Sequence, residues 1–349
     1  MTQPHILYVV PTFNRAADLP RTVGAIAAQD WPDARKSILV VDNASTDNTT
    51  EVLAELAPRL PCRLEHLRKA PEGPTVARNI GIARGRDGLV ALVDSDVELD
   101  RGWTRATVAA MQEDPTLAMV GGRLVFGHDA TLLNSFGGTT SFLGLSWDQD
   151  EGADSDSITG PRDVLWANSS ALLLRPGPVL AAGGFDEGFF YSYEEPDLGL
   201  RLAIAGWRAR MVPTAVALHH VDMRIVPGHP DMIFHITKNR IRMGLKLWAW
   251  PRLIAFLALN AGFSFADVAL RAPRMARLRA LWWNVAHLGE TLRLRKAAQA
   301  LRRVPDSEVA ARLDRAWFPA NRLRGQRRRM VRGSILAGGS DDRVAARRG

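Results

Sequence analysis

The chain has 349 residues, of which 46% are hydrophobic and 23% charged, a composition that excludes global disorder and allows two structural units. Its single cysteine, Cys62, excludes a disulfide scaffold and a thiolate metal cluster. The longest charge-free stretch of the C-terminal third, residues 253–266, has 14 residues, fewer than the roughly 20 that a spanning helix needs. We therefore expect no conventional transmembrane helix, and no signal peptide because the first residues carry no basic region.

Charge is distributed unevenly along the chain. Residues 1–225 contain 20 Lys and Arg against 29 Asp and Glu, whereas residues 226–349 contain 25 against 8. The net charge of +8 thus combines an acidic segment with a strongly basic one. We expect a domain over residues 1–225 and a basic, Trp- and Arg-rich helical extension over residues 226–349 with a disordered end.

The first 94 residues alternate between short apolar runs and segments with apolar residues at helical spacing. This alternation predicts an α/β fold whose parallel sheet is covered by helices on both faces. Ligands of such sheets bind beyond the carboxyl ends of the strands. The expected strands are 5–10, 37–41, 63–67 and 89–93, and the expected helices are 18–28, 49–60 and 74–83.

Further along the chain the pattern is less regular. Residues 118–126 and 164–174 resemble strands, and the Gly-, Ser- and Asp-rich residues 137–160 between them are long enough to form an active-site loop. From about residue 226 the alternation stops and amphipathic helices follow.

Two carboxylates, Asp94 and Asp96, follow the fourth expected strand. If the backbone stays extended, both side chains point to the same side, where their repulsion calls for a divalent cation such as Mg²⁺ or Mn²⁺. The alternative is a solvated turn in which Ser95 caps a helix.

Asp42 also ends an apolar strand, where a carboxylate can accept the N3–H of a uracil or thymine ring. Asp47, close by, is better explained as a helix-capping residue. The chain has no Gly-x-Gly-x-x-Gly after the first strand and no Gly-Lys-Ser/Thr, which counts against a dinucleotide-dependent dehydrogenase and a P-loop nucleotidase.

An acidic group precedes a short helix at residues 194–197. Pro196 disfavours helical geometry at the preceding residue, which makes Glu195 a candidate N-cap and, kept ionised by the helix dipole, a candidate general base. Simple dipole compensation is the alternative. His219 follows another apolar run and could complete a metal site or contact a diphosphate. The alternative, which is favoured when the residue is considered on its own, is an ordinary polar residue at a strand end.

Taken in order, these motifs resemble the family 2 glycosyltransferases, inverting enzymes with a GT-A fold, of the type that builds bacterial envelopes and polysaccharides. The resemblance covers roughly residues 5–225 and implies a mixed, mainly parallel sheet. The motifs that carry it are Val9–Asn14, Val41–Asp47, Ala77–Gly81, Val93–Asp96, Gly183–Phe190, Tyr193–Leu198 and His219.

The resemblance also implies roles for individual residues. Pro11, Thr12 and Asp42 would hold the nucleoside, with Asn14, Arg15 and Ser95 in the same strand-end clusters. Arg78 and Asn79 would lie near the diphosphate. Asp94 and Asp96 would form the D-x-D motif that binds Mg²⁺ or Mn²⁺, with His219 completing the metal site. The base would be Glu195, with Glu194 and Asp197 as its acidic neighbours; the family commonly has Glu-Asp at the first two of these positions.

The function that follows is transfer of a sugar from a UDP- or dTDP-sugar to a hydroxyl of a glycan or polyprenyl-linked acceptor. A sugar nucleotidyltransferase and a non-catalytic sugar-nucleotide-binding or membrane-adaptor protein are the alternatives. Trp beside Arg in the extension suits an anionic membrane surface, so we expect a cytoplasmic enzyme peripheral to the inner face of the membrane. Packing against the domain would explain the same residues, and nucleic acid is not an expected partner.

Overall fold

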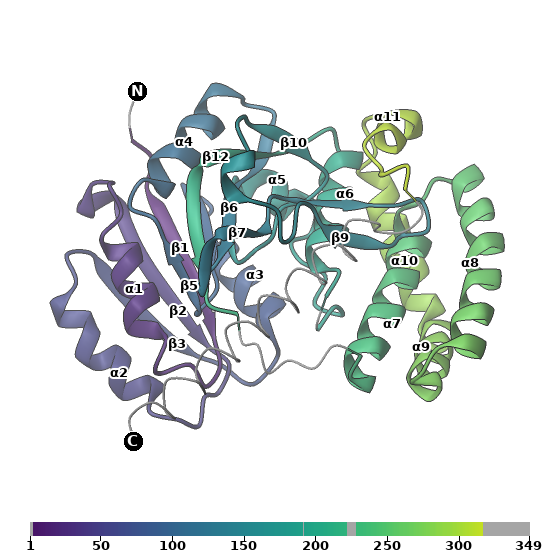
Figure 1. The fold of residues 1–349 in the computed structure, drawn as a ribbon, viewed down its shortest axis with the longest axis horizontal. Helices are drawn as coiled ribbons and strands as arrows, with labels where there is room; N and C mark the ends of the chain where they lie inside the picture. The colour runs from purple at the N-terminus through teal and green to yellow at the C-terminus, as the bar shows by residue number, and fades with distance from the viewer. Residues whose placement is uncertain (1–2, 191, 222–227, 317–349) are drawn as a thin grey trace, which may run out of the picture.

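The computed structural model describes residues 3–190, 192–221 and 228–316. Within these residues, ten strands form one mixed sheet in the order β10-β12-β6-β11-β4-β1-β2-β3, with β5 paired to β12 and β7 paired to β6 (Figure 1). The strands of this sheet are β1 (Ile6–Thr12), β2 (Lys36–Asp42), β3 (Arg63–Arg68), β4 (Leu89–Val93), β5 (Val97–Leu99), β6 (Leu117–Phe126), β7 (Asp129–Ser135), β10 (Arg162–Val164), β11 (Ala171–Leu174) and β12 (Arg208–His219).

The N-terminal half of the sheet confirms the parallel pairing expected from the apolar runs. Strand β1 lies between β2 and β4 and pairs with both in parallel, and β3 adds to β2 in the same direction. Thr12 therefore stands beside Asp42 in the register of β1 and β2, at the carboxyl ends of both strands. This edge is where polar side chains from distant parts of the sequence meet.

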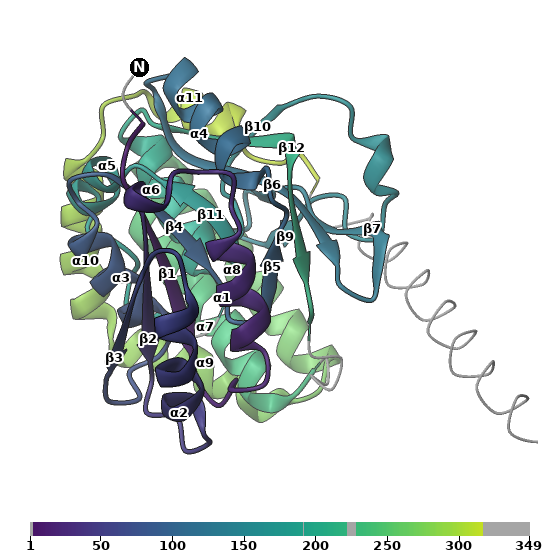
Figure 2. The same ribbon diagram turned by 90° about the vertical axis from the view of Figure 1, so that its left-hand side faces the viewer.

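Helices cover both faces of the sheet, as expected. One buried apolar cluster packs the sheet against α1 (Leu19–Ala27), α2 (Thr49–Leu56) and α4 (Trp103–Glu113). A second cluster packs the opposite face against α3 (Pro74–Arg84), α5 (Pro176–Ala181) and α6 (Glu194–Ile204). Figure 2 views the molecule from the side of α1 and α2.

Two sequence-based expectations in the middle of the chain are wrong. Residues 137–160 are not one loop, because β8 (Gly138–Thr140) and β9 (Ser146–Asp148) pair within them as a small second sheet. Residues 164–174 are not one strand, because β10 ends at Val164 and β11 begins at Ala171. Between them the polar residues 168–170 leave the sheet and enter the site described below.

The C-terminal helices pack against α6. They are α7 (Pro230–Leu247), α8 (Trp250–Leu270), α9 (Arg274–Ala286), α10 (Leu288–Ala300) and α11 (Asp306–Ala311). Figure 1 shows α8 on the outer side of this group. A third apolar cluster, which includes Leu200 of α6 and Trp248 and Phe256 of the extension, joins them to the domain. The expected disordered end lies outside the described residues.

Helix α8 is longer than the charge-free stretch from which no spanning helix was expected. It has 21 residues and is long and apolar enough to cross a membrane. The estimate from sequence was too short because Arg252 and Asp267 lie inside the helix rather than beyond its ends. Each of the two is paired with an opposite charge, Arg252 with Asp306 and Asp267 with Arg277.

Candidate active site

Asp94 follows β4, and both of its carboxylate oxygens are engaged by protein donors. Oδ1 accepts a hydrogen bond from Arg78 Nη2 at 2.9 Å, and Oδ2 accepts one from Ser170 Oγ at 2.7 Å. Burial would raise the pKa of Asp94, but Arg78 and Ser170 outweigh it, and the pKa lies below its usual value. Asp94 is therefore an ionised carboxylate held in place by Arg78 and Ser170.

The chain turns immediately after Asp94, since Val97 N donates to Asp94 O at 3.0 Å. The expectation of extended backbone from Asp94 to Asp96 is therefore wrong, and the two carboxylates have different partners. Asp96 Oδ1 lies 3.4 Å from His219 Nε2, and Asp96 Oδ2 lies 3.7 Å from Arg15 Nη2.

His219 is oriented by Asn134, whose Oδ1 lies 2.8 Å from His219 Nδ1. An acceptor at Nδ1 places the ring hydrogen there and leaves the lone pair of Nε2 facing Asp96. In the part of the chain that the structure describes, no three His, Cys, Asp or Glu side chains converge as a metal site. Asp96 and His219 form a two-ligand set, which fits a divalent ion that fills its remaining positions with water and substrate phosphate oxygens.

Glu195 and Glu194 lie in the first turn of α6 and differ in their surroundings. Glu195 is partly exposed, and its Oε1 accepts hydrogen bonds from Ser169 Oγ at 2.5 Å and Ser169 N at 3.3 Å. Glu194 is 8% exposed, and its Oε2 has no hydrogen-bond partner among the described residues. Burial, and then the neighbouring charge of Glu195, raise the pKa of Glu194 to about 8. The pair thus combines an accessible carboxylate with a buried, protonated one.

Arg78 joins the two acidic groups. Its guanidinium is buried, with Nη2 bonded to Asp94 and Nη1 3.6 Å from Glu194 Oε1. On the other side, Ser169 binds Glu195 and the adjacent Ser170 binds Asp94. Residues from α3, from the end of β4, from the start of β11 and from α6 therefore meet in one polar group.

The expected nucleoside site lies at the ends of β1 and β2. Asp42 is fully buried; its Oδ1 accepts a hydrogen bond from Ser45 N at 2.8 Å, and its Oδ2 has no hydrogen-bond partner within the described residues. His66 Nε2 and Arg68 Nη1 lie 3.5 and 3.6 Å from that oxygen. The hydroxyl of the neighbouring Thr12 is also buried without a partner there. Two buried oxygens at adjacent strand ends are thus left for a ligand.

The other predicted residues of this region mainly shape its loops. Pro11 is buried in β1, and Asn14 accepts a hydrogen bond from Thr46 N at 2.7 Å, which ties the loop after β1 to the loop after β2. Ser95 is buried, and its carbonyl accepts a hydrogen bond from Thr22 Oγ1 at 2.9 Å.

Comparison with known proteins agrees with this geometry. Residues 8–140 match the family model described as Glycosyl transferase family 2. This part of the chain has the sequence of a family 2 glycosyltransferase. It is 30% identical over 290 residues to a pre-mycofactocin glycosyltransferase of Mycobacterium tuberculosis, an alignment that covers 78% of this chain and 57% of the relative. The chain thus spans little more than half the length of that relative.

Other proteins similar to this chain are also named as glycosyltransferases. An N-acetylglucosaminyl-diphospho-decaprenol L-rhamnosyltransferase of M. tuberculosis is 28% identical over 61% of this chain and 75% of its own length. Among solved structures, a Pyrobaculum calidifontis mannosyltransferase in complex with GDP-Man and Mn²⁺ has a TM-score of 0.53 at 19% identity and covers 89% and 84% of the two chains. Staphylococcus aureus TarS in complex with UDP-GlcNAc has a TM-score of 0.55 at 16% identity, over 88% and 89%. These two likenesses establish the GT-A fold.

Five expectations for the site need correction. Asp197 is fully buried and paired with Arg201 and Lys246, so it cannot reach a substrate as a base would. Asn79 uses its side-chain amide on the backbone of Phe185, so that amide is not a free donor for a diphosphate.

Arg78 Nη2 donates to Asp94 and its Nη1 lies 3.6 Å from Glu194 Oε1, so both terminal nitrogens face carboxylates. Asp94 accepts a hydrogen bond at each oxygen, and its protein partners differ from those of Asp96.

Glu195 is also not the N-cap. Tyr193 occupies the N-cap position of α6 without a side-chain capping hydrogen bond. Pro196 lies inside the first turn, where its missing N–H costs no intrahelical hydrogen bond.

Nothing in the sequence indicated that Ser169 and Ser170 bind carboxylates or that Asn134 contacts His219. Ser169 and Ser170 stand directly before an apolar strand, whereas Asp42 ends such a strand and Asp94 follows one. The pattern places the two serines at a strand boundary but gives no indication of which carboxylate each one binds.

Proposed function

We propose that this chain is a metal-dependent inverting glycosyltransferase that moves a sugar from a nucleoside-diphosphate donor to a hydroxyl group of a glycan or lipid-linked acceptor. The observation that carries the proposal is that adjacent serines hold Glu195 and Asp94, since Ser169 binds the first and Ser170 the second. Asp96 and His219, which also lie at strand ends, contact each other. The names of the related glycosyltransferases support the same reaction class.

Asp42 is the residue we assign to recognition of the base. Its buried Oδ2 has the basic side chains of His66 and Arg68 at ion-pair distance but accepts no hydrogen bond from the described residues, so it can accept one from a ligand. The N3–H of uracil or thymine supplies that hydrogen bond, whereas the pyrimidine N3 of cytosine carries no hydrogen. We propose a UDP- or dTDP-sugar as the donor, and a CDP-sugar does not fit this contact.

Asp96 and His219 are the residues we assign to a Mg²⁺ or Mn²⁺ ion. Carboxylate and imidazole leave most of the coordination sphere to the diphosphate, and such an ion stabilises the negative charge that develops on the leaving group. Asn134 fixes the imidazole with Nε2 directed at this position. Asp94 then acts through Arg78 and Ser170 and shapes the site next to the ligands.

Glu195 is the base of the proposed reaction. It is the accessible member of the acidic pair, and Ser169 stabilises its ionised form, whereas the neighbouring Glu194 stays protonated near neutral pH. As the acceptor oxygen bonds to the anomeric carbon, its proton passes to Glu195. The bond from the anomeric carbon to the diphosphate breaks on the opposite side, so configuration inverts and a nucleoside diphosphate leaves.

Turnover of a panel of nucleotide sugars with and without Mn²⁺ tests this function. We expect Mn²⁺-dependent release of UDP or dTDP from one donor, and loss of release in Glu195→Gln by roughly 10²- to 10⁴-fold with donor binding retained. Full activity in Glu195→Gln or in Asp96→Ala would refute the assignment. Donor binding without any turnover would favour the non-catalytic alternative.

The extension is the second part of the proposal, because its outer helices expose apolar side chains and bury polar ones. In α8, Asn260 and Ser264 are buried, whereas Ile254 and Phe265 are 65% and 79% exposed. Soluble helices have the reverse pattern.

Helix α9 repeats this arrangement. Arg277 and Asn284 face inward and are buried, while Met275 and Trp282 are 68% and 71% exposed. The two helices contact each other, so the exposed residues extend over both. An apolar surface of this kind calls for a covering partner.

Charge indicates which partner covers this surface. At one edge, Trp250 and Leu292 share a pocket with Arg295, Lys296 and Arg302. Apolar and Trp side chains beside several cations match the boundary between acyl chains and anionic headgroups. We therefore assign the α8–α9 surface to the cytoplasmic leaflet of a membrane, where a lipid-linked acceptor would be presented.

Co-sedimentation with vesicles tests this assignment. We expect binding to phosphatidylglycerol vesicles at low salt, weaker binding to phosphatidylcholine vesicles, and loss of binding in a Phe265→Ser/Trp282→Ser variant. Failure of the unchanged chain to bind anionic vesicles at low salt would refute it.

A further inference from the structure

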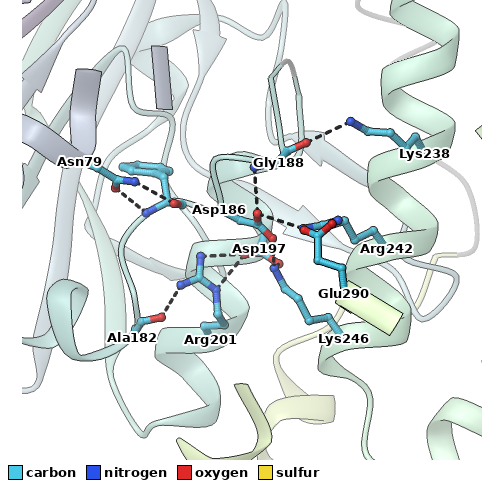
Figure 3. A network of polar contacts seen from close by, with 11 residues as sticks. Asn79, Ala182, Asp186, Gly188, Asp197, Arg201, Lys238, Arg242, Lys246 and Glu290 are labelled. Carbon is cyan, nitrogen blue, oxygen red and sulfur yellow. Dashed lines mark hydrogen bonds and ion pairs between the residues drawn. The ribbon is translucent and has the colours of Figure 1, made fainter. Parts of the chain in front are cut away.

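Helix α7 contributes three cations to a buried polar network next to α6 (Figure 3). Lys246 Nζ lies 2.5 Å from Asp186 Oδ2 and 2.7 Å from Asp197 Oδ1, and its side chain is 2% exposed. One turn earlier, Arg242 Nη2 lies 3.4 Å from Asp186 Oδ1, and another turn earlier Lys238 Nζ donates to Gly188 O at 3.0 Å. This face of α7 is therefore directed at α6 and at the loop before it.

Lys246 connects two carboxylates that belong to different segments. Asp197 is in the first turn of α6, two residues after Glu195, and its other oxygen is paired with Arg201 at 2.7 Å. Asp186 is in the loop after α5. Burial disfavours the ionised form of Asp186, but Lys246 and Arg242 outweigh it and hold its pKa well below the usual range.

The loop that contains Asp186 leads directly back to the proposed active site. Its Phe185 backbone is held by Asn79, whose Nδ2 donates to Phe185 O at 2.9 Å and whose Oδ1 accepts from Phe185 N at 2.8 Å. Asn79 follows Arg78, the residue that joins Asp94 to Glu194. The network thus lies behind the acidic pair, with contacts to both of the segments that frame it.

Helix α7 also holds the backbone from which α6 starts. Ser192 and Tyr193 have φ angles of 64° and 75°, a region that L side chains rarely adopt. Asn239 of α7 is fully buried, and its Nδ2 donates to Ser192 O at 2.7 Å. Two successive residues in this conformation persist only where surrounding contacts hold them.

We propose that Lys246 and Asn239 of α7 are positioning residues of the active site, which set the orientation of the first turn of α6 and so the reach of Glu195. This proposal rests on the proposed function. The helical extension is then part of the catalytic machinery, independently of any membrane contact. The residues proposed to bind the sugar nucleotide on β1, β2 and β12 do not belong to α6. Loss of either positioning residue therefore alters the chemical step more than it alters binding of the sugar nucleotide.

Kinetics of the full chain test the proposal with Lys246→Met and Asn239→Ala. We expect kcat to fall by roughly tenfold to a hundredfold, as misplacement of a reacting group does, while the donor KM changes less than about threefold. Lys246→Arg keeps the charge and is expected to restore part of kcat. Release of nucleoside diphosphate in detergent solution is the readout, so vesicle binding does not enter.

Arg277→Met is the matched control. This variant removes a buried cation from the same extension. Arg277 is paired with Asp267, with Nε 2.6 Å from Oδ2, and both residues lie away from α6. We expect its kcat to stay within about threefold of the unchanged chain. An equal fall in this control, or unchanged kcat in Asn239→Ala and in folded Lys246→Met, would overturn the proposal. If Lys246→Met does not fold, Asn239→Ala alone decides. An inactive unchanged chain would instead refute the proposed function.

Discussion

Ser169 donates two hydrogen bonds to one oxygen of Glu195, from its hydroxyl at 2.5 Å and from its backbone amide at 3.3 Å. Ser169 is fully buried, whereas Glu195 is partly exposed, so the contact ties an accessible carboxylate to a buried residue. Hydrogen bonds to an ionised group are stronger than those between neutral groups and fix its direction. The proposed base is therefore oriented by a residue 26 positions before it in the sequence.

Replacement of that hydroxyl gives the first prediction. We expect Ser169→Ala to lower kcat by roughly tenfold, because a charge-assisted hydrogen bond contributes about 1.5–3 kcal/mol and its loss leaves Glu195 free to rotate. The donor KM stays nearly constant. Steady-state kinetics measure both, and Ser157→Ala, in an exposed turn, is the control. A loss confined to KM would contradict a role at the base.

Protonation of Glu194 gives the second prediction. Its pKa of about 8 in the folded chain lies above the usual value of 4.5. Between these pH values the folded chain keeps a proton that the unfolded chain has lost, so this group makes the free energy of unfolding fall as pH rises. Glu194→Gln removes that contribution.

We therefore expect the stability of Glu194→Gln relative to the unchanged chain to increase with pH across this window, by at most about 1.4 kcal/mol per pH unit. Urea unfolding at several pH values measures it, with the exposed Glu187→Gln as control. A stability difference that does not change with pH would show that Glu194 is ionised in the folded chain.

The third prediction concerns the orientation of His219. Asn134→Ala removes the acceptor at Nδ1, and loss of such an outer partner typically weakens metal affinity by roughly 10- to 100-fold. Asn134→Asp retains an acceptor and should keep most of the affinity. The Mn²⁺ concentration at half-maximal activity, together with direct titration of Mn²⁺ in the presence of UDP, gives the comparison. Equal Mn²⁺ affinities in the unchanged chain and both variants would show that Asn134 does not support metal binding.

The fourth prediction concerns the base of the donor. Asp42→Asn removes the carboxylate that would accept the N3–H and should weaken UDP binding by roughly tenfold or more, as loss of a charge-assisted hydrogen bond does. Binding of CDP is the internal control, because N3 of cytosine carries no hydrogen. Calorimetric titration of both nucleotides measures the effect, and parallel losses would indicate damage to the loop instead.

The strands β1 to β4 and the helices between them were predictable, because runs such as Leu89–Val93 are apolar over the full length of a strand buried on both faces. The carboxylates after those strands were predictable for the same reason. The partners were not: Ser170 lies 76 residues from Asp94, and nothing in the spacing of either residue specifies that contact.

The details that went wrong have local causes. The turn after Asp94 depends on a hydrogen bond to Val97 that an apolar pattern does not encode. Glu195 was placed at the N-cap because proline disfavours helical geometry at the residue before it. In the structure the helix begins at Glu194, after Tyr193 in the left-handed region, so Glu195 lies inside the first turn. The pairing of Lys246 with Asp197 requires knowing how α7 packs on α6, which single-sequence periodicity does not provide.

Arg78 is one cation divided between two acids, Asp94 at 2.9 Å and Glu194 at 3.6 Å. Removing the negative charge at position 94 would release the guanidinium to Glu194 and draw the proton off that carboxyl. Substitutions at the two positions are therefore energetically coupled, and their separate kinetic penalties will not multiply when combined. A double variant should be less impaired than independent behaviour would give, so single-residue rates at this site cannot be read as separate contributions.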